Sequence, residues 1–289
     1  MPNNIQLAKN YTDLLDLAYK EASVTSDLTS DSSLIRAGAN ANEIVYPQID
    51  VTGLGDYDRN SGYTQGSVKV EWKTAKFNYD RGTKITVDTM DDEETFDIAF
   101  GMAGAELQRT KVAPEADAFT FATLAGLENI TTKAESIVDA EQFLAALLVA
   151  RNAMDEAEVP QENRLLYATP TLINGLMALD TYKSKEVLNG FTVVKKVPQS
   201  RFYTAIDLLD GKSTGEEAGH YKKAEAGKDI NFMIVEKSAI IKWDKHTASN
   251  VIAPENNPDS DGYISKYRKY GIVDAYAHQR AGIYVSHKA

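Results

Sequence analysis

The sequence predicts an α+β protein made of a β-ribbon, one long helix and a separate α/β unit. Apolar and polar residues alternate over 68–87, a helical pattern follows directly from residue 89, and helical and extended segments alternate over 136–255. Because the ribbon leads into the helix without a loop, we expect the long helix to organise the rest of the chain.

The composition is that of a folded, soluble protein, with 43% apolar and 25% charged residues among 289. A formal net charge of -11 argues against a protein that gains affinity by neutralising phosphates. The absence of cysteine excludes disulfides, thiolate nucleophiles and iron–sulfur clusters. Neither a signal peptide nor an apolar run of about 18 residues is found, so we expect a cytoplasmic protein without a membrane partner.

The N-terminal residues predict an arm. Residues 5–22 carry a partial helical stripe of apolar side chains, and the polar stretch SVTSDLTSDSS follows it. The apolar surface is too small for a domain. We therefore expect this segment to pack on the body of its own chain or on a neighbour.

The ribbon is expected after a short extended piece, IVYPQIDVTGL, and a loop at 55–66 that is rich in Gly, Asp and Asn. Apolar residues at 68, 70 and 72 alternate with charged residues at 69, 71 and 73, and a further strand is expected over 83–87. We predict a hairpin with turns at Gly66 and Gly82. Because one of its faces is largely polar, the hairpin is expected to project from the body.

The long helix is predicted to begin at Thr89, which suits an N-cap, and the acids at 91–94 lie where the helix dipole favours negative charge. Pro114 lacks a backbone donor and is expected to kink the helix or to divide it in two. Counted through the kink, about 30 residues at 1.5 Å each give a rod on the order of 45 Å.

Opposite charges are segregated along this stretch. The bases of the ribbon face only Glu71 and Asp80, and the helix start has no base before Arg109. A positive ribbon beside a negative helix start is the feature of the sequence that suggests a function. The bases are Lys69, Lys73, Lys76, Arg81 and Lys84, and the acids of the helix start are Asp91, Asp92, Glu93, Glu94 and Asp97, preceded by Asp88.

Residues 136–255 are predicted to alternate helices and strands. Asp139 with Gln142 forms a capping-box pattern ahead of one helix, and Thr169 with Pro170 starts a second. The whole segment 136–255 has the usual size of one α/β domain. Strands are expected at 165–168, 191–197, 202–209, 232–236 and 239–243.

The last segment alternates in two runs on either side of 279–282, which favours antiparallel strands over a helix. A hairpin is marginally stable alone, so we expect it to pack on the apolar stripe of the long helix. The C-terminus should then return to the domain that begins at residue 88.

No catalytic, cofactor or metal site is expected. Residues 56, 58 and 60 have the spacing of a calcium loop, but Ser61 and Ser67 stand where Gly and Glu are required. The GKS sequence at 211–213 imitates the end of a phosphate loop without the glycine that should precede it. The four histidines are far apart in sequence, and none forms a metal-binding pair at helical spacing.

Several segments together resemble the major capsid proteins of tailed double-stranded DNA phages. They are the ribbon end FNYDRGTKITVDTMDDEET, the helix segment GMAGAELQRTKVAPEADAF, the α/β middle and the terminal PENNPDSDGYISKYRKYGIVDAYAHQRAGIYV. The resemblance covers most of the chain and implies the Hong Kong 97 type capsid fold. It assigns 1–48 to an N-arm, 49–87 to an extended E-loop, 88–135 and 255–289 to a peripheral domain with its spine helix, and 136–254 to an α/β axial domain.

The resemblance implies a structural protein that self-assembles, as hexamers and pentamers, into the icosahedral shell around the phage genome. We expect assembly in the host bacterial cytoplasm and a final place in the virion. We also expect a separate scaffolding protein and a portal as partners, with packaged DNA only in non-specific proximity. Every functional residue is then an interface residue, and the five ribbon bases of one subunit are expected to lie across the acidic helix start of its neighbour.

The sequence departs from some relatives in two ways. It has no long helical extension of the kind that a fused scaffold would add, and no motif marks a partner for a covalent cross-link through the ribbon lysines, so none is expected. Two alternatives stay open. One is an encapsulin-like nanocompartment, which shares the fold and encloses protein cargo. The other is a soluble α/β enzyme whose catalytic domain is the middle segment.

Overall fold

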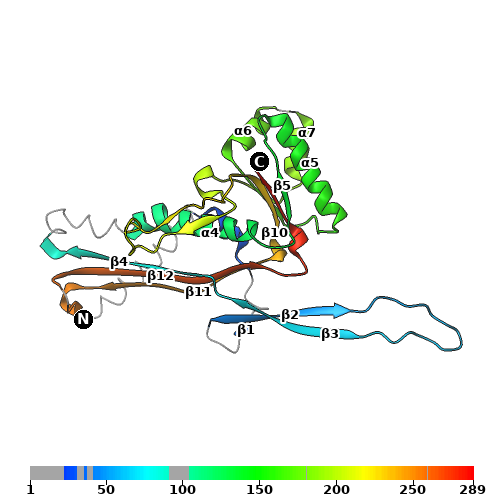
Figure 1. Ribbon diagram of the computed structural model, residues 1–289, viewed down its shortest axis with the longest axis horizontal. Helices are drawn as coiled ribbons and strands as arrows, with labels where there is room; N and C mark the ends of the chain where they lie inside the picture. Colours follow the sequence, from blue (N-terminus) through cyan, green and yellow to red (C-terminus); the bar gives the residue numbers. More distant parts are fainter. Residues whose placement is uncertain (1–22, 31–35, 38–41, 91–103, 180, 259) are drawn as a thin grey trace.

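The chain folds into two main β-sheets, helices that pack on them, and a ribbon that extends away from the body (Figure 1). The structure, a computed structural model, describes residues 23–30, 36–37, 42–90, 104–179, 181–258 and 260–289. The strands are β1 (Arg36–Ala37), β2 (Glu43–Val51), β3 (Val68–Lys76), β4 (Tyr79–Asp88), β5 (Thr131–Ala134), β6 (Arg164–Ala168), β7 (Val193–Lys196), β8 (Ile206–Leu208), β9 (Tyr221–Lys223), β10 (Ile230–Glu236), β11 (Ile240–Ile252), β12 (Gly262–Ala275) and β13 (Ile283–His287).

The helices lie mainly in the middle of the chain. Short turns connect several of the strands. The helical elements are η1 (Val24–Leu28), the π-helical turn η3 (Gln108–Val112), α4 (Ala113–Ala125), α5 (Ala140–Glu156), α6 (Pro170–Ala178), α7 (Tyr182–Asn189), η4 (Gln199–Arg201), η5 (Lys237–Ala239), η6 (Pro254–Asn256) and η7 (Arg280–Gly282).

The long helix passes through Pro114 without a break. Residues 104–125 are helical throughout, and η3 leads directly into α4. Pro114 follows the π turn directly, so the helix is already irregular in the turn that the proline ring meets. Of the predicted kink or division at Pro114, the division is wrong, and a π turn lies on the N-terminal side of the proline.

The predicted N-cap shifts by one residue. Thr89 and Met90 are already helical, and the Asp88 carboxylate accepts a hydrogen bond from the Met90 N–H at 3.0 Å. Asp88 therefore occupies the N-cap position. The arm predicted at 5–22 and the acids at 91–97 lie outside the described residues.

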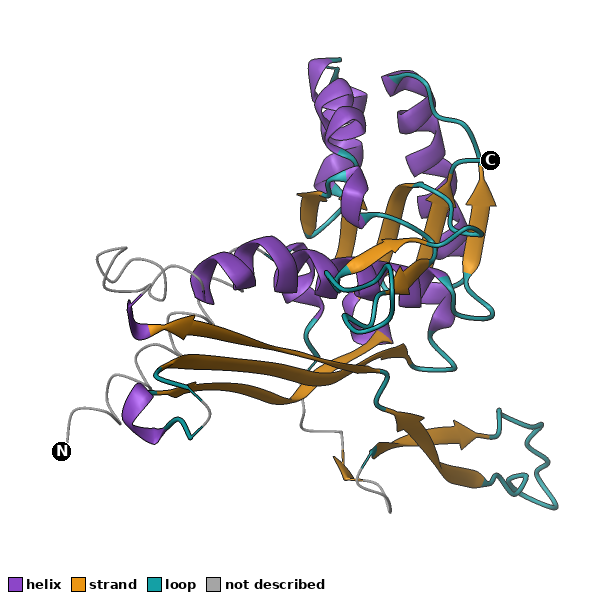
Figure 2. Ribbon diagram, turned by 60° about the vertical axis from the view of Figure 1, so that its left-hand side comes forward, coloured by secondary structure: helices purple, strands orange, loops and turns teal. Residues whose placement is uncertain are grey.

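The larger sheet has the order β5-β13-β10-β6-β7 and is covered on both faces. Alternate residues of β10 point to opposite faces: Phe232 and Ile234 pack with α5, α6 and α7, whereas Met233 and Val235 share a core with Phe121 of α4. Figure 2 shows the helices standing on this sheet. Burial on both faces explains why β6 and β10 are nearly continuous apolar runs.

The helix starts on this sheet confirm the predicted caps. The Asp139 carboxylate accepts a hydrogen bond from the Gln142 N–H at 2.8 Å, and the Gln142 side chain accepts one from the Val138 N–H at 3.0 Å. Thr169 is the N-cap of α6, and Pro170 is its first residue. Strands predicted over 165–168, 191–197, 232–236 and 239–243 are confirmed as β6, β7, β10 and the start of β11; of 202–209, only Ile206–Leu208 is a strand.

The second sheet has the order β11-β12-β4, with antiparallel pairing throughout. Val273 and Ala275 of β12 lie in the same core as Phe121 and Leu124 of α4. The C-terminal segment therefore does return to the long helix. The hairpin predicted around 279–282 is wrong, however, because β12 lies in this sheet whereas β13 lies between β5 and β10 in the larger one.

The ribbon pairs β3 with β2, and β4 belongs to the second sheet. Gly66 lies in the connection between β2 and β3, but Gly82 lies inside β4, so the turn predicted there is wrong. A Cβ atom at Gly82 would be 2.8 Å from the Tyr267 carbonyl oxygen on β12. The glycine is explained by this close approach of two backbones.

Candidate functional site

One face of the ribbon is apolar and exposed. The pairing places Ile49 opposite Val70 and Val51 opposite Val68. Directly opposed residues of an antiparallel pair point to the same side, so the four side chains form one surface. Their exposed fractions are 64% and 53% for the first pair and 61% and 66% for the second. We call this surface, made of Pro47, Ile49, Val51, Val68, Val70 and Trp72, the apolar face of the ribbon.

The opposite face of the ribbon is polar, and its charged side chains form ion pairs with one another. Lys69 and Lys73 both form ion pairs with Glu71, the second at 2.9 Å. Hydrogen bonds from Lys69 and then Lys73 hold the pKa of Glu71 at about 2. Asp50 lies opposite Lys69 on the neighbouring strand. Two of the predicted contact lysines therefore already have an acidic partner within the ribbon.

Strand β2 brings acids to the ribbon that the sequence did not assign to it. Glu43 lies opposite Lys76, and Asp50 opposite Lys69. The prediction of a positive ribbon is therefore wrong, because the partner strand β2, which was not counted in the predicted ribbon, carries acidic residues. Over residues 43–76 the acids are Glu43, Asp50, Asp56, Asp58 and Glu71, and the bases are Arg59, Lys69, Lys73 and Lys76.

Arg81 and Lys84 lie on β4 in the body of the protein. The Arg81 guanidinium donates to the Glu115 carboxylate at 2.7 Å and to the carbonyl oxygens of Leu209 and His220 at 2.8 and 3.2 Å. Lys84 is exposed and lies opposite Lys266 on β12. Their predicted place in the projecting ribbon is wrong, because pairing with β12 holds β4 in the sheet.

Glu115 is a buried carboxylate that joins α4 to β4. Besides Arg81, it accepts a hydrogen bond from the Tyr79 hydroxyl at 3.3 Å, and His220 Nδ1 lies 3.6 Å from its second oxygen. Burial acts to raise the pKa of Glu115, but His220 and Arg81 outweigh it and leave the pKa below its ordinary value. This cluster holds the helix on the sheet.

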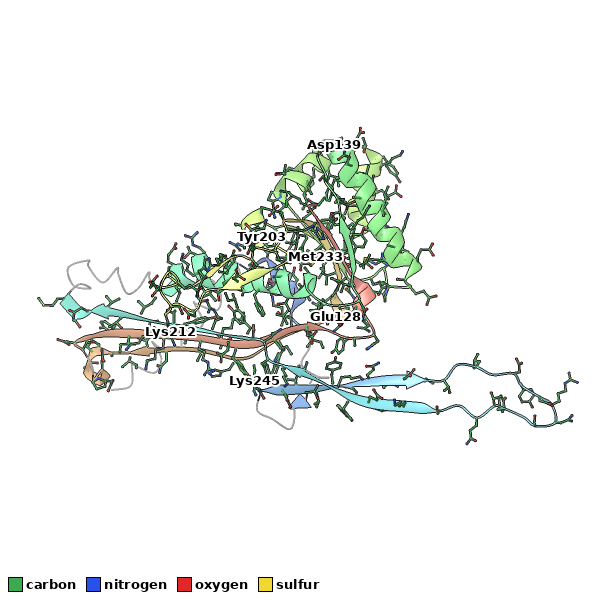
Figure 3. The ribbon with its side chains drawn as sticks, viewed as in Figure 1. Glu128, Asp139, Tyr203, Lys212, Met233 and Lys245 are labelled. Atoms are coloured by element: carbon green, nitrogen blue, oxygen red, sulfur yellow. The ribbon has the colours of Figure 1, made fainter. Side chains whose placement is uncertain are left out.

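The base of the ribbon is fixed to the second sheet. Phe77 packs on Tyr270, with ring centroids 4.7 Å apart, and Lys245 Nζ lies 5.1 Å from the centre of the Phe77 ring. Figure 3 shows Lys245 where the ribbon meets the sheet. The Asn78 amide donates to the Val273 carbonyl at 2.8 Å and accepts from the Val273 N–H at 3.0 Å. These contacts set the direction in which the ribbon leaves the body.

Residues 23–30 are anchored to α4 by Asp117, which is fully buried. Its carboxylate accepts hydrogen bonds from the Ser23 and Thr25 hydroxyls at 2.8 and 2.7 Å, and from the Val24 and Thr25 N–H groups at 2.9 and 3.1 Å. Arg201 donates to it at 3.2 Å. The five donors satisfy the charge and fix the position of this segment.

Lys242 of β11 completes the anchor. Its buried Nζ donates to the Thr25 carbonyl and hydroxyl at 2.8 and 2.6 Å, and its backbone exchanges hydrogen bonds with Ser30. Leu28 is buried in the main core. This anchor was not predicted from the sequence. The available signals were the acids Glu115 and Asp117 within the helical segment APEADAFTF and the single charge of Lys242 within AIIKW.

The remaining candidates of the sequence give no site in the described part of the chain. The acids predicted to meet the ribbon bases, at 91–94 and 97, lie outside it. Within it, no group of three or more His, Asp or Glu side chains could hold a metal ion. The Asp58 carboxylate accepts the Asn60 N–H at 2.6 Å, as in an ordinary turn. No described helix is long and apolar enough to cross a membrane.

Comparison with known proteins identifies the fold. No family model and no curated protein matches the chain. Solved structures do match over nearly its whole length. A chain of Mycobacterium phage Che8 is 13% identical with a TM-score of 0.60, covering 91% of this chain and 90% of that one. The capsid of the cyanophage P-SCSP1u is 13% identical with a TM-score of 0.59, covering 93% and 88%.

A third match is a virus-like particle from Pyrococcus furiosus, which is 11% identical with a TM-score of 0.57 and covers 97% of this chain and 99% of that one. At such identities the likeness establishes the fold. The chain has the mixed α/β fold found in phage capsids and in this particle.

Proposed function

We propose that this chain is the major capsid protein of a tailed double-stranded DNA phage and self-assembles into the icosahedral shell around the genome. The observation that carries the proposal is the ribbon, which extends from the body and leaves an apolar face in solvent. An exposed apolar patch of this kind is expected where another subunit binds. The fold shared with phage capsids over nearly the full chain supports the same function.

In this proposal the ribbon is the E-loop and the helix over 104–125 belongs to the spine helix. Strand pairing supports an E-loop of 42–77 rather than the predicted 49–87, because β4 pairs with β12. The larger sheet with α5, α6 and α7 is the axial domain, and the second sheet with α4 is the peripheral domain. Strands β5 and β13 join the axial sheet from outside the predicted range of 136–254.

The proposed partners are further copies of the chain, in hexamers and pentamers, together with a scaffolding protein and a portal. A net charge of -11 supports a shell whose wall does not bind the packaged DNA tightly. Contact between the ribbon lysines and the acids at 91–97 of a neighbour remains part of the proposal only as water-exposed ion pairs at the edge of the contact. We do not expect it to supply most of the affinity, because an exposed ion pair contributes only about 0–1 kcal/mol.

A protein-filled nanocompartment is the second candidate; the match to the Pyrococcus furiosus virus-like particle shows a related fold and does not favour this candidate over a phage capsid. The two candidates differ in what the shell encloses. Particles from the natural source should contain double-stranded DNA if the chain is a capsid protein, and a cargo protein if it is a compartment. The ratio of absorbance by nucleic acid to absorbance by protein separates them directly.

Removal of the ribbon tests the proposed function. The wild-type chain is expected to form closed shells in negative-stain images and a particle-sized species in light scattering. Replacing 47–72 by an Asn-Gly turn joins Tyr46 to Lys73, which lie opposite each other. This variant should remain folded, because Tyr46 and Ala75 keep their places in the cluster at the ribbon base, but it should not form shells.

Shells of normal size from the shortened variant would contradict the role of the ribbon. A small, monodisperse wild-type species would contradict the function itself and would favour the alternative of a soluble enzyme. Circular dichroism of the shortened variant is the control for folding.

A further inference from the structure

A cavity of about 500 Å³ lies where the loop over 209–220 meets strand β4 and the helix over 104–125. Figure 3 shows Lys212 of this loop over the second sheet. The volume is within the range of about 300–1,000 Å³ that is typical of small-molecule sites. The ribbon over 42–77 contributes no residue to the lining, so the cavity is separate from the proposed contact between subunits.

Three lysines from three different elements line this cavity. Lys84 comes from β4, Lys111 from η3 and Lys212 from the loop. In the part of the chain that the structure describes, the side chain of none of the three forms an ion pair or a hydrogen bond. Because acids outnumber bases in this chain by 42 to 31, composition alone does not explain why three such lysines surround one cavity.

The acids around the cavity are already engaged elsewhere. Glu115 forms its ion pair with Arg81 at 2.7 Å, and the Glu217 carboxylate accepts a hydrogen bond from the Gly215 N–H at 3.0 Å. Asp210, the third acid of the lining, binds groups of its own loop. The lysines of the cavity are therefore the charged groups for which the described residues supply no partner.

The loop that carries one of these lysines contains the GKS sequence at 211–213. Asp210 accepts hydrogen bonds from the Ser213 hydroxyl at 2.6 Å and from the N–H groups of Ser213 and Lys212 at 2.8 Å each, and these bonds hold the pKa of Asp210 at about 2. A phosphate loop binds its ligand with backbone N–H groups of this kind, and here they are occupied. An anion in the cavity must therefore be held by side chains, and the same bonds fix the loop that carries the Lys212 ammonium.

Lys84 faces a like charge across the sheet. It lies directly opposite Lys266 on β12, and like charges in this position destabilise a pair of strands. On the same two strands, Asp80 forms an ion pair with Arg268 at 2.6 Å, so opposite charges do meet where the sheet has them. An anion beside Lys84 would offset the repulsion between the two lysines.

His220 adds an unsatisfied polar atom to the lining. Its Nδ1 is buried and has no hydrogen-bond partner among the described residues, and the Glu115 oxygen lies 3.6 Å away. Buried polar atoms are rarely left without a partner, and a bound ligand is one explanation. His220 also has a φ of +73°, which is uncommon for a residue other than glycine, and its carbonyl oxygen accepts a hydrogen bond from Arg81 at 3.2 Å.

We propose that this cavity binds a small compound with two or more phosphate groups through the side chains of Lys84, Lys111 and Lys212. Lysine binds phosphate as a point charge, whereas a carboxylate is matched best by the planar fork of an arginine. The arginine of the cavity, Arg81, already binds Glu115 and two backbone carbonyls. Three ammonium groups from different directions suit the several charged oxygens of a short polyphosphate. The site does not depend on the proposed function.

Isothermal titration calorimetry of the full-length protein with inorganic tripolyphosphate tests this inference. We expect one site per chain. Lys111→Gln and Lys212→Gln should each weaken binding about tenfold, because each removes one charged hydrogen-bond donor. Both side chains are exposed, so the variants should unfold at the wild-type temperature. The matched control, Lys183→Gln, removes the same charge from the exposed surface of α7, outside the cavity, and should leave the affinity within about twofold of wild type.

Four outcomes would overturn the inference. The first is that the wild-type protein does not bind tripolyphosphate, and the second is that Lys183→Gln weakens binding as much as the cavity variants do. Citrate carries its charges on carboxylates and should bind at least about tenfold more weakly, so equal affinity for citrate is the third. The fourth is a single-stranded oligonucleotide that binds as tightly as tripolyphosphate and with the same dependence on the lysines, because the ligand would then be a nucleic acid. None of these measurements depends on the formation of shells.

Discussion

An Asp117→Ala substitution is expected to lower the free energy of unfolding by about 3–5 kcal/mol. The carboxylate is fully buried and accepts hydrogen bonds from Ser23, Val24, Thr25 and Arg201. Its removal leaves the buried Ser23 and Thr25 donors without their carboxylate acceptor and takes one ion-pair partner from the partly buried Arg201. Urea denaturation followed by tryptophan fluorescence measures the change.

The matched control is Asp80→Ala, which removes an acid whose partner, Arg268, is exposed. The Asp80–Arg268 pair has its closest contact at 2.6 Å, with exposed side-chain fractions of 45% and 58%. Its loss should cost only about 0–1 kcal/mol. If the two variants are equally stable, residues 23–30 are not held by Asp117.

As the pH rises from 8 to 10, the free energy of unfolding is expected to increase by about 2–3 kcal/mol because of Lys242. Burial lowers the pKa of this lysine from 10.5 to about 8. In this window the folded chain has lost the Lys242 proton and the unfolded chain keeps it. Unfolding therefore takes up a proton, and it becomes less favourable as the pH rises. The charged groups that act on it are Asp117 and Asp244, which raise its pKa, and Lys269 and Lys195, which lower it.

Lys242→Met is the comparison that isolates this effect. The free energy of unfolding of wild type, relative to that of the variant, should increase from pH 8 to pH 10. The titration stops at pH 10 because tyrosines with raised pKa values, such as Tyr46 and Tyr276, begin to reduce stability above it. Equal pH profiles for the two proteins would mean that Lys242 is not buried as a neutral amine.

Local structure could be predicted where a residue acts on its own neighbours. Asp139 marks a helix start through a hydrogen bond within one turn, and Thr169 and Pro170 mark another through the backbone geometry of its first turn; all three were assigned correctly. The strands of the middle segment were also found, because two-sided burial leaves a continuous apolar run. These signals are complete within a few residues of sequence.

Strand pairing could not be predicted in the same way, because it depends on residues far apart. β2 contains Pro47, which counts against a paired strand, yet at this position β2 pairs only with β3, so the missing N–H faces an open edge. Gly82 resembled a turn residue and is instead required by the close approach of β12. Each error follows from a neighbour that sequence spacing does not reveal.

The ribbon could be singled out from the sequence, but the face through which it makes contact stays a prediction. The alternation of 68, 70 and 72 with 69, 71 and 73 separates the two faces from sequence alone. The structure adds that the lysines of the polar face already have an acidic partner, because Glu71 forms ion pairs with both Lys69 and Lys73. Charges attract attention in a sequence, whereas an apolar face is informative only when its exposure is known.

An electron cryomicroscopy reconstruction of the assembled particle tests the central claim most directly. We expect a closed shell in which the β2–β3 ribbon of each subunit lies on another copy, with Ile49 and Val70 buried in the contact and Lys73 facing solvent. A shell in which the apolar face remains in solvent, or in which the lysine face is the buried one, would contradict the account.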